Sequence, residues 1–177
     1  MQTPILDAFG VPSHGKIVLR TRLDNDIDNI QPWSYSKIEW SRLGESPNQF
    51  EKLGARRTSE ACPVYNCHGL TFGNRRTQVD DSYKTISGIL LDDGFDQIPE
   101  SEVRLGDIVV YYDGEGNAAH SGIVLNKGDL RGPVVWSKWG KSYEMIHALP
   151  VCPYDPSNVK FYRMVRCKFE EIFGRNL

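Results

Sequence analysis

The chain of 177 residues has no long hydrophobic run, since it contains no stretch of 18 consecutive apolar residues. A membrane-spanning helix needs about 20 such residues, so we expect no membrane span. The first residues, MQTPILDAFGVPSHGK, also lack the charged start and apolar core of a secretory signal. We therefore expect the protein in the cytoplasm, unless a specialised route exports it or a leader precedes this sequence.

Charge of one sign is missing as well. The chain has 21 Lys and Arg against 23 Asp and Glu, and a formal net charge of −2. A protein that binds nucleic acid through its phosphates needs a basic face, so we expect no nucleic-acid partner. Hydrophobic residues make up 40% of the chain and aromatic residues 11%, which excludes a disordered protein. The length fits one domain with one core.

Cysteine is scarce, with residues at positions 62, 67, 152 and 167. These are too few for a disulfide scaffold of this size, and their ordinary interpretation is buried free thiols. Two alternatives stay open. One is a disulfide between Cys62 and Cys152, and the other is a zinc site formed by Cys62, Cys67, His68 and Cys152, whose spacing matches no common zinc motif. We expect neither a metal nor an organic cofactor.

The first part of the chain, residues 1–60, is interrupted repeatedly by proline and glycine. Alternation predicts a strand over 16–23. A short helix is predicted over 46–54, because Ser46 can cap it and Gly54 can end it. This part is interpreted as an irregular extension or subdomain.

The second part, residues 61–177, is interpreted as the core of a single domain. From residue 100 the sequence pattern is typical of β-strands, which are separated by turns too short for helical crossovers. The predicted elements are strands over 108–112, 118–126, 133–140 and 159–165, a loop over 141–158 and a helix over 166–174. The predicted fold class is α+β with an antiparallel meander.

The most distinctive segment is Asn66-Cys67-His68-Gly69. The residues before Cys67 are poor helix formers, whereas an apolar run begins at Leu70. Cys67 is therefore expected at the N-terminus of a short helix, where free N–H groups favour a thiolate and can hold an oxyanion. Cys67 is the candidate nucleophile. The alternative is a buried structural cysteine.

His120 is the candidate base for this nucleophile. It opens a predicted strand directly after a turn, and a thiol nucleophile needs an imidazole held by rigid backbone. The small residues Ser121 and Gly122 beside it suggest that something approaches closely there. The alternative is a partly exposed histidine at a strand end.

A third group should fix the tautomer of the His120 imidazole. Ser137, on the next predicted strand, is the first choice. His147, in the predicted loop, is the second choice. The alternatives are ordinary strand polarity for Ser137 and a surface loop residue for His147.

Further residues are expected around the site. The Asn66 side chain is expected to contact the oxyanion. His68 lies about 100° around the helix axis from Cys67, so it is expected to form a wall of the site or to support it. Tyr65, Trp136 and Trp139 are expected to line the substrate cleft, although aromatic strand residues more often belong to the core.

These segments together resemble the NlpC superfamily of papain-like thiol hydrolases, which is related to the CHAP-type amidases and endopeptidases. CPVYNCHGLTF resembles its nucleophile segment, and LGDIVVYYDGEGNAAHSGIVL resembles its G-D-[IV] strand and the strand that opens with the catalytic histidine. VVWSKWGKSYEMIHALPVCPY is similar to the C-terminal part of the sequences in one branch of the superfamily. The resemblance covers residues 62–154.

The resemblance implies a papain-like fold, in which a helix carrying the nucleophile Cys67 packs on an antiparallel sheet carrying the base His120. It also implies cleavage of amide bonds, often in bacterial peptidoglycan peptides. The third residue of the family is usually His, Asn, Gln or an acid, whereas this chain has Ser137 or Lys138 there. A thiol acyltransferase or deamidase, a toxin-type effector and an inactive binding module remain alternative functions. The expected partner is a substrate derived from peptides or peptidoglycan, and the alternative partner is a protein inhibitor or immunity protein.

Overall fold

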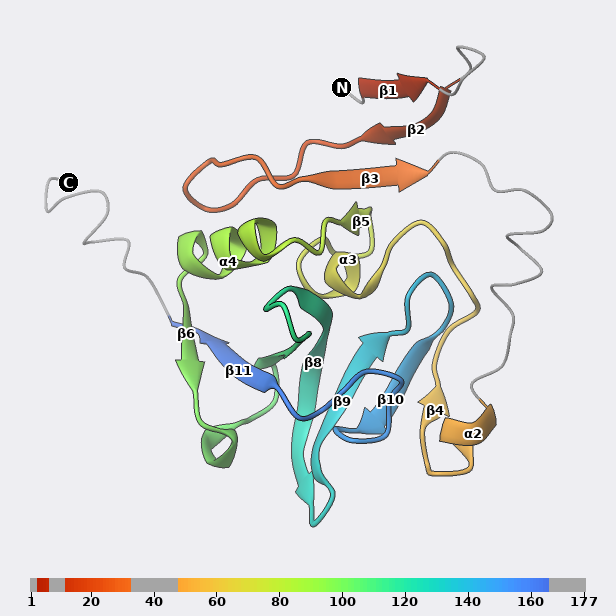
Figure 1. The fold of residues 1–177 in the computed structure, drawn as a ribbon, viewed down its shortest axis with the longest axis vertical. Helices are drawn as coiled ribbons and strands as arrows, with labels where there is room; N and C mark the ends of the chain where they lie inside the picture. Colours follow the sequence, from red (N-terminus) through yellow and green to blue (C-terminus); the bar gives the residue numbers. More distant parts are fainter. Residues whose placement is uncertain (1–2, 7–11, 33–47, 166–177) are drawn as a thin grey trace, which may run out of the picture.

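The computed structural model describes residues 3–6, 12–32 and 48–165 (Figure 1). The cap at Ser46, the predicted helix over 166–174 and Cys167 lie outside the described residues. Within them the fold is mixed α+β, with mostly antiparallel sheets and few helices, so the predicted fold class is confirmed at that level. No helix in these ranges is both long and apolar enough to cross a bilayer.

A large sheet forms the centre of the molecule, and each of its neighbouring strand pairs is antiparallel. Its strand order is β4-β10-β9-β8-β7-β11-β6. The strands are β4 (Arg56–Arg57), β6 (Phe95–Ile98), β7 (Ile108–Tyr112), β8 (Ala118–Asp129), β9 (Gly132–Lys138), β10 (Glu144–Ala148) and β11 (Val159–Met164).

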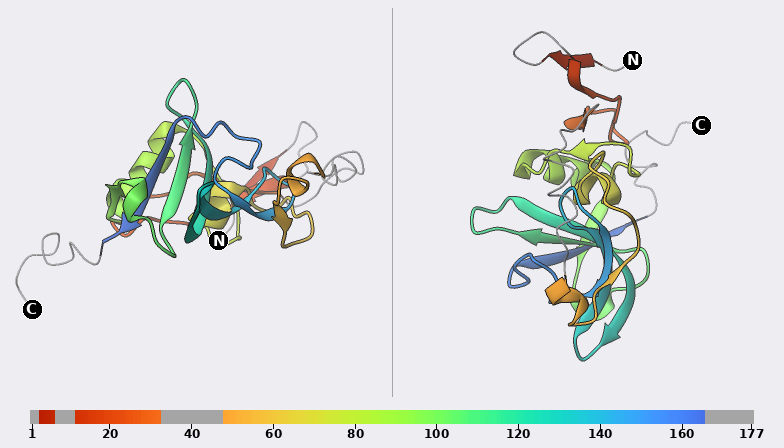
Figure 2. Two further views of the ribbon diagram at one scale, coloured as in Figure 1. Left: turned by 90° about the horizontal axis from the view of Figure 1, so that it is seen from below. Right: turned by 90° about the vertical axis from the view of Figure 1, so that its right-hand side faces the viewer.

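A second sheet has the order β1-β2-β3-β5. Its strands are β1 (Thr3–Leu6), β2 (Pro12–Lys16), β3 (Asn29–Pro32) and β5 (Gln78–Val79). The helices are α2 (Asn48–Glu51), α3 (Cys67–Thr71), α4 (Tyr83–Asp92) and a 3₁₀ turn at Glu100–Glu102. Two perpendicular views place α3 and α4 between the two sheets (Figure 1, Figure 2).

Alternation along β7 divides the core into two clusters, one on each face of the large sheet. Val109 and Tyr111 belong to one cluster. Ile108 and Val110 belong to the other, which includes the buried face of α4. Successive side chains of a strand point to opposite faces, so this central strand is covered on both sides.

Asp107 fixes the start of β7. The two carboxylate oxygens accept hydrogen bonds from the Arg163 guanidinium of β11, at 2.9 Å and 2.7 Å. The backbone N–H of Arg104 donates to the same carboxylate at 2.8 Å. Gly106 precedes it with a positive φ of 90°, which favours glycine. The Gly-Asp-Ile sequence therefore has a structural role in this sheet.

The predicted strands over 108–112, 118–126, 133–140 and 159–165 are confirmed, with small differences at their ends. The helix predicted over 46–54 is present as the shorter α2. Helix α4, capped by the Ser82 side chain, was missed.

The single strand predicted over 16–23 is wrong, because β2 ends at Lys16. The buried Asn29 side chain accepts from the backbone N–H of Ile17 and donates to its carbonyl, at 3.1 Å and 3.0 Å. These backbone groups are therefore paired with a side chain, and Leu19 and Ile27 fold into the core around a turn.

The loop predicted over 141–158 is also wrong, because it contains β10. A short turn follows β9, and β10 pairs with it from Glu144 opposite Lys138 to Ala148 opposite Val134. Glu144 is charged but buried, so a pattern based on apolar alternation does not detect this strand.

Candidate functional site

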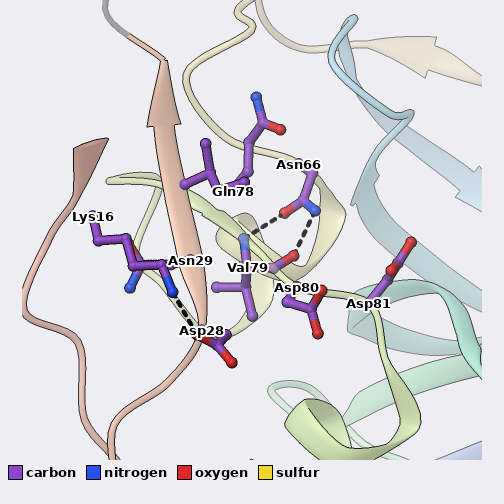
Figure 3. A pocket seen from close by; sticks show the side chains of 9 residues that line it. Lys16, Asp28, Asn29, Asn66, Gln78, Val79, Asp80 and Asp81 are labelled. Carbon is purple, nitrogen blue, oxygen red and sulfur yellow. Dashed lines mark hydrogen bonds and ion pairs between the residues drawn. The ribbon is translucent and has the colours of Figure 1, made fainter. Parts of the chain in front are cut away.

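Cys67 is the first residue of α3, as predicted, and the Asn66 side chain caps the helix. The Asn66 Oδ1 accepts from the N–H groups of Gly69 and Val79 at 2.8 Å and 3.1 Å, and its Nδ2 donates to the Val79 carbonyl at 2.8 Å. Figure 3 shows the two bonds to Val79. The Asn66 amide therefore holds the start of α3 against β5. Both the oxygen and the nitrogen of the Asn66 amide are therefore hydrogen-bonded.

The Cys67 thiol is 5% exposed and lies near two imidazoles, those of His68 and His120. Burial alone would raise the pKa of the Cys67 thiol, but the charge of His68 and then that of His120 hold it well below the ordinary value. Helix α3 has only five residues, so its dipole is a small contribution beside the imidazoles.

His120 is completely buried on β8. Neither of its ring nitrogens makes a regular hydrogen bond within the described part of the chain, although the interaction with the thiol tends to raise the pKa of the imidazole. Burial is the larger effect, and it lowers the pKa of His120 below its ordinary value. Loosely aligned contacts of this kind are common in sites without substrate.

Aromatic rings fix the orientation of the His120 imidazole. Tyr154 stacks on it with ring centroids 3.8 Å apart and planes at 5°. Tyr111, its cross-strand neighbour on β7, lies at 5.2 Å with a tilted ring. The imidazole is therefore held by ring packing.

Ser137 and His147, the residues expected to orient His120, bond to one another instead. The Ser137 Oγ lies 2.8 Å from the His147 Nε2, and the His147 Nδ1 donates to the Ala148 carbonyl at 2.9 Å. Burial lowers the pKa of His147 to about 4, so its ring is neutral and Ser137 is the donor. His147 lies on β10.

His68 lies between α3 and β8 and is 1% exposed. Its Nδ1 is 2.9 Å from the Ser121 Oγ and its Nε2 is 2.7 Å from the Ala118 carbonyl. Burial opposes a charge on this ring, but the Cys67 thiolate raises the pKa of His68 above its ordinary value. The His68 side chain is thus held by β8, and its charge interacts with the Cys67 thiol.

The close approach inferred from Ser121 and Gly122 is made by β9. A Cβ at Gly122 would lie 2.5 Å from a methyl group of Val135 and 3.0 Å from the Cβ of Ser137. Ser121 faces the opposite side of β8 and contacts α3. The small residues therefore serve sheet and helix packing.

The three aromatic residues expected in the cleft lie at different depths. Tyr65 is buried and donates to the Glu144 carboxylate at 2.5 Å, and Trp136 is half-buried and donates to the same group at 3.1 Å. Trp139 is buried against Phe50, and its Nε1 has no partner among the described residues. Trp136 is the most accessible of the three.

Glu144 and Lys138 are buried charged residues. The sequence singled out only Lys138, as the alternative to Ser137 at the third position that the resemblance implies, and it missed Glu144. The Glu144 carboxylate also accepts from Arg75 at 2.6 Å. Burial tends to raise the pKa of Glu144, but the hydrogen bonds from Arg75 and Tyr65 outweigh burial, so the pKa is lowered. Lys138 donates to the Ser142 carbonyl and lies 4.6 Å from the centre of the Tyr65 ring. Burial lowers the pKa of Lys138 to about 8.

A cavity of about 430 Å³ opens beside the cap of α3 (Figure 3). Asn66 and Gln78 line it together with carboxylates from two segments. Lys16 pairs with one of these, Asp28, at 2.7 Å. Asn66, which directly precedes Cys67, is one of the lining residues, and Asp80 and Asp81 are others.

Cys62, Cys67 and Cys152 are free thiols, so the alternative disulfide is not formed in this structure. Within the described ranges no three His, Cys, Asp or Glu side chains are grouped so that they could hold a metal ion. The alternative zinc set that includes His68 therefore does not converge.

Compared with protein-family models, with curated proteins and with solved structures, the chain matches none. The chemistry of the site is therefore inferred from its own residues.

Proposed function

We propose that the protein is a thiol hydrolase of the papain-like, NlpC type, which cleaves amide bonds such as those of peptidoglycan peptides. The observation that supports this most strongly is the Cys67 thiol, buried at the start of α3, beside the His120 imidazole of β8. A cysteine with a lowered pKa beside a histidine is the arrangement that activates a thiol nucleophile.

The reaction has two half-reactions. The Cys67 sulfur attacks the amide carbonyl, the C–S bond forms, and the proton shared by Cys67 and His120 passes to the leaving amine as the C–N bond breaks. His120 then takes a proton from water, whose oxygen attacks the thioester. The acid leaves, and the thiol is restored with that proton.

Three features of the site support these roles. The stacked Tyr154 holds the imidazole plane, so that one ring nitrogen is kept available for proton transfer. The backbone N–H groups of the first turn of α3 can contribute to the oxyanion site. The Asn66 amide, bonded to Gly69 and Val79, is assigned to positioning the nucleophile rather than to the oxyanion.

Selective alkylation tests the proposal. Iodoacetamide at pH 6.5 should label Cys67 well ahead of the other thiols, as read by peptide mass spectrometry. Cys152 is the matched comparison, because it is also buried and burial raises its pKa. Equal labelling of all cysteines in the folded protein, or a Cys67 thiol with an ordinary pKa near 8.5, would contradict an activated nucleophile and favour an inactive binding module.

Turnover is tested on a panel of muropeptides and short peptides, with products identified by mass spectrometry. The wild type and Cys152→Ala should release an acid and an amine, and Cys67→Ala should not. Transfer of the acyl group to a second amine would identify an acyltransferase instead. Release of ammonia from a side-chain amide would identify a deamidase.

A further inference from the structure

His68 uses both of its ring nitrogens as hydrogen-bond partners inside the molecule. The Nε2 lies 2.7 Å from the Ala118 carbonyl oxygen. A carbonyl oxygen can only accept, so the Nε2 carries a hydrogen and donates it. The protonation state of the ring therefore depends on the other nitrogen.

The Nδ1 of His68 is the first member of a chain of short contacts. It lies 2.9 Å from the Ser121 Oγ, which lies 2.9 Å from the Thr71 Oγ1, which lies 3.0 Å from the Cys67 carbonyl oxygen. The chain begins at one residue of α3, passes through β8 and returns to the helix.

The direction of each bond follows from its last acceptor. The Cys67 carbonyl can only accept, so Thr71 donates its single hydroxyl hydrogen to it. Ser121 must then donate its own hydrogen to Thr71. The Ser121 oxygen has only lone pairs left, and therefore the His68 Nδ1 must be a donor too.

We infer that His68 is an imidazolium, with a hydrogen on each ring nitrogen, and that this fixed cation is a counter-ion of the neighbouring Cys67 thiolate. A neutral His68 would leave the chain one hydrogen short. Two facing oxygens at 2.9 Å would then lack a hydrogen, or Thr71 would no longer bond to the Cys67 carbonyl. Leaving such a partly buried polar contact unmade disfavours the neutral ring.

The charged groups around His68 agree with this assignment. Cys67 faces it on its own helix, His120 faces it from β8, and Asp80 and Asp81 follow β5. Burial disfavours the cation, but the Cys67 thiolate, the Ala118 carbonyl and Asp81 together raise the pKa of His68. The positive charge also lowers the pKa of His120.

This assignment deepens the proposed function and rests on it for its catalytic meaning. The site then holds a permanent cation at His68 and one shared proton between Cys67 and His120. His68 keeps the thiolate populated, and in that state the shared proton is on His120, which delivers it to the leaving amine. His68 is thus a positioning residue, which acts through Cys67 by stabilising the thiolate with its positive charge.

The inference is tested by measuring the pH dependence of Cys67 alkylation, followed at this residue by mass spectrometry. His68→Gln supplies an uncharged amide that can still form hydrogen bonds, so only the positive charge is lost. The pKa of the Cys67 thiol should then rise towards 8.5, and the alkylation rate at pH 6 should fall at least tenfold. His120→Gln should keep most of the reactivity at low pH. The reverse pattern, with reactivity lost in His120→Gln and kept in His68→Gln, would overturn the inference.

Thr71 offers a second test that does not touch the imidazole or the thiol. Thr71→Val frees the Ser121 hydrogen to point at the His68 Nδ1, so a neutral ring becomes favourable and the thiol pKa should rise. Thr71→Ser keeps the hydroxyl and should behave as the wild type. Identical pH profiles for Thr71→Val and Thr71→Ser would contradict the hydrogen-bond chain.

The wild type gives a direct readout as well. Both ring nitrogens of His68 should show the ¹⁵N NMR shifts of protonated imidazole at pH 7, with a spectrum assigned by its loss in His68→Gln. One unprotonated nitrogen would overturn the assignment. These readouts need no substrate, so failure of this inference leaves the proposed nucleophile standing, whereas an unreactive Cys67 in the wild type would remove the proposed function.

Discussion

His120 and Tyr154 stack face to face, with ring centroids 3.8 Å apart and planes at 5°. The two residues come from different parts of the fold, since His120 is on β8 and Tyr154 is in the segment before β11. In the proposed hydrolase this stack replaces the hydrogen-bonded third residue of a catalytic triad, because Ser137 is bonded to His147.

The first prediction concerns this stack. Tyr154→Phe keeps the ring and should retain kcat within about a factor of three. Tyr154→Leu keeps apolar volume but loses the flat surface, so the imidazole can rotate and kcat should fall about 10- to 100-fold, as for an orienting group. Steady-state kinetics of both variants check this, with circular dichroism as the control for folding. Equal loss in both would assign the effect to the Tyr154 hydroxyl.

The second prediction concerns the buried His147. Burial lowers its pKa to about 4 in the folded state, against about 6.5 when unfolded. Between these values the unfolded chain binds the proton and the folded chain does not, so stability should fall as pH falls from 6.5 to about 4. The expected loss is about 3 kcal/mol, since the two pKa values differ by about 2.5 units and each unit corresponds to about 1.36 kcal/mol.

Urea denaturation at a series of pH values measures this loss. His147→Gln still offers an acceptor to Ser137 but does not titrate, so its stability should depend less on pH in this window. His120, also buried with a lowered pKa, leaves some dependence in the variant. A variant with the same slope as the wild type would show that His147 is not responsible.

Part of this fold could be read directly from the sequence. The strands β7, β8, β9 and β11 were found because apolar runs separated by dense turn signals leave little choice of structure. The start of α3 was predicted because the residues before Cys67 are poor helix formers and an apolar run begins at Leu70. The structure adds that the Asn66 side chain caps the helix. These signals are local, and local signals are what one sequence contains.

The errors share a physical cause, which is burial of polar groups by partners distant in the chain. Strand β10 begins at the buried Glu144, whose partners Tyr65 and Arg75 lie about 70 residues or more away. The strand predicted over 16–23 fails because the Asn29 side chain takes the backbone groups of Ile17. Tyr154 ends the segment VVWSKWGKSYEMIHALPVCPY, but its stacking on His120 cannot be deduced from the spacing of residues.

The third prediction concerns Glu144, whose carboxylate accepts from Tyr65, Arg75 and Trp136. Glu144→Gln replaces one acceptor oxygen by a donor that faces donors, so the free energy of unfolding should fall by about 2–4 kcal/mol. Because Tyr65 lies two residues before Cys67, the alkylation rate of the thiol should also change.

Asp24→Asn is the control, since its ion pair with Arg20 is exposed and should contribute less than about 1 kcal/mol. Chemical denaturation compares the two variants with the wild type. Equal small effects would show that the Glu144 network adds no more than a surface ion pair.

The last prediction concerns the approach of α3 to the segment before β5. A Cβ at Gly69 would lie 1.9 Å from the Thr77 carbonyl oxygen, so Gly69→Ala must push the helix away from that backbone. The expected cost is about 3 kcal/mol of stability, together with a lower reactivity of Cys67, because the helix that carries the thiol shifts. Gly88→Ala, inside α4 with no atom within 4 Å of the added carbon, should instead stabilise the protein by about 0.5–1 kcal/mol. Thermal unfolding and iodoacetamide labelling of both variants measure the contrast, and a Gly69→Ala variant as stable as Gly88→Ala would contradict the tight packing of α3 at this point.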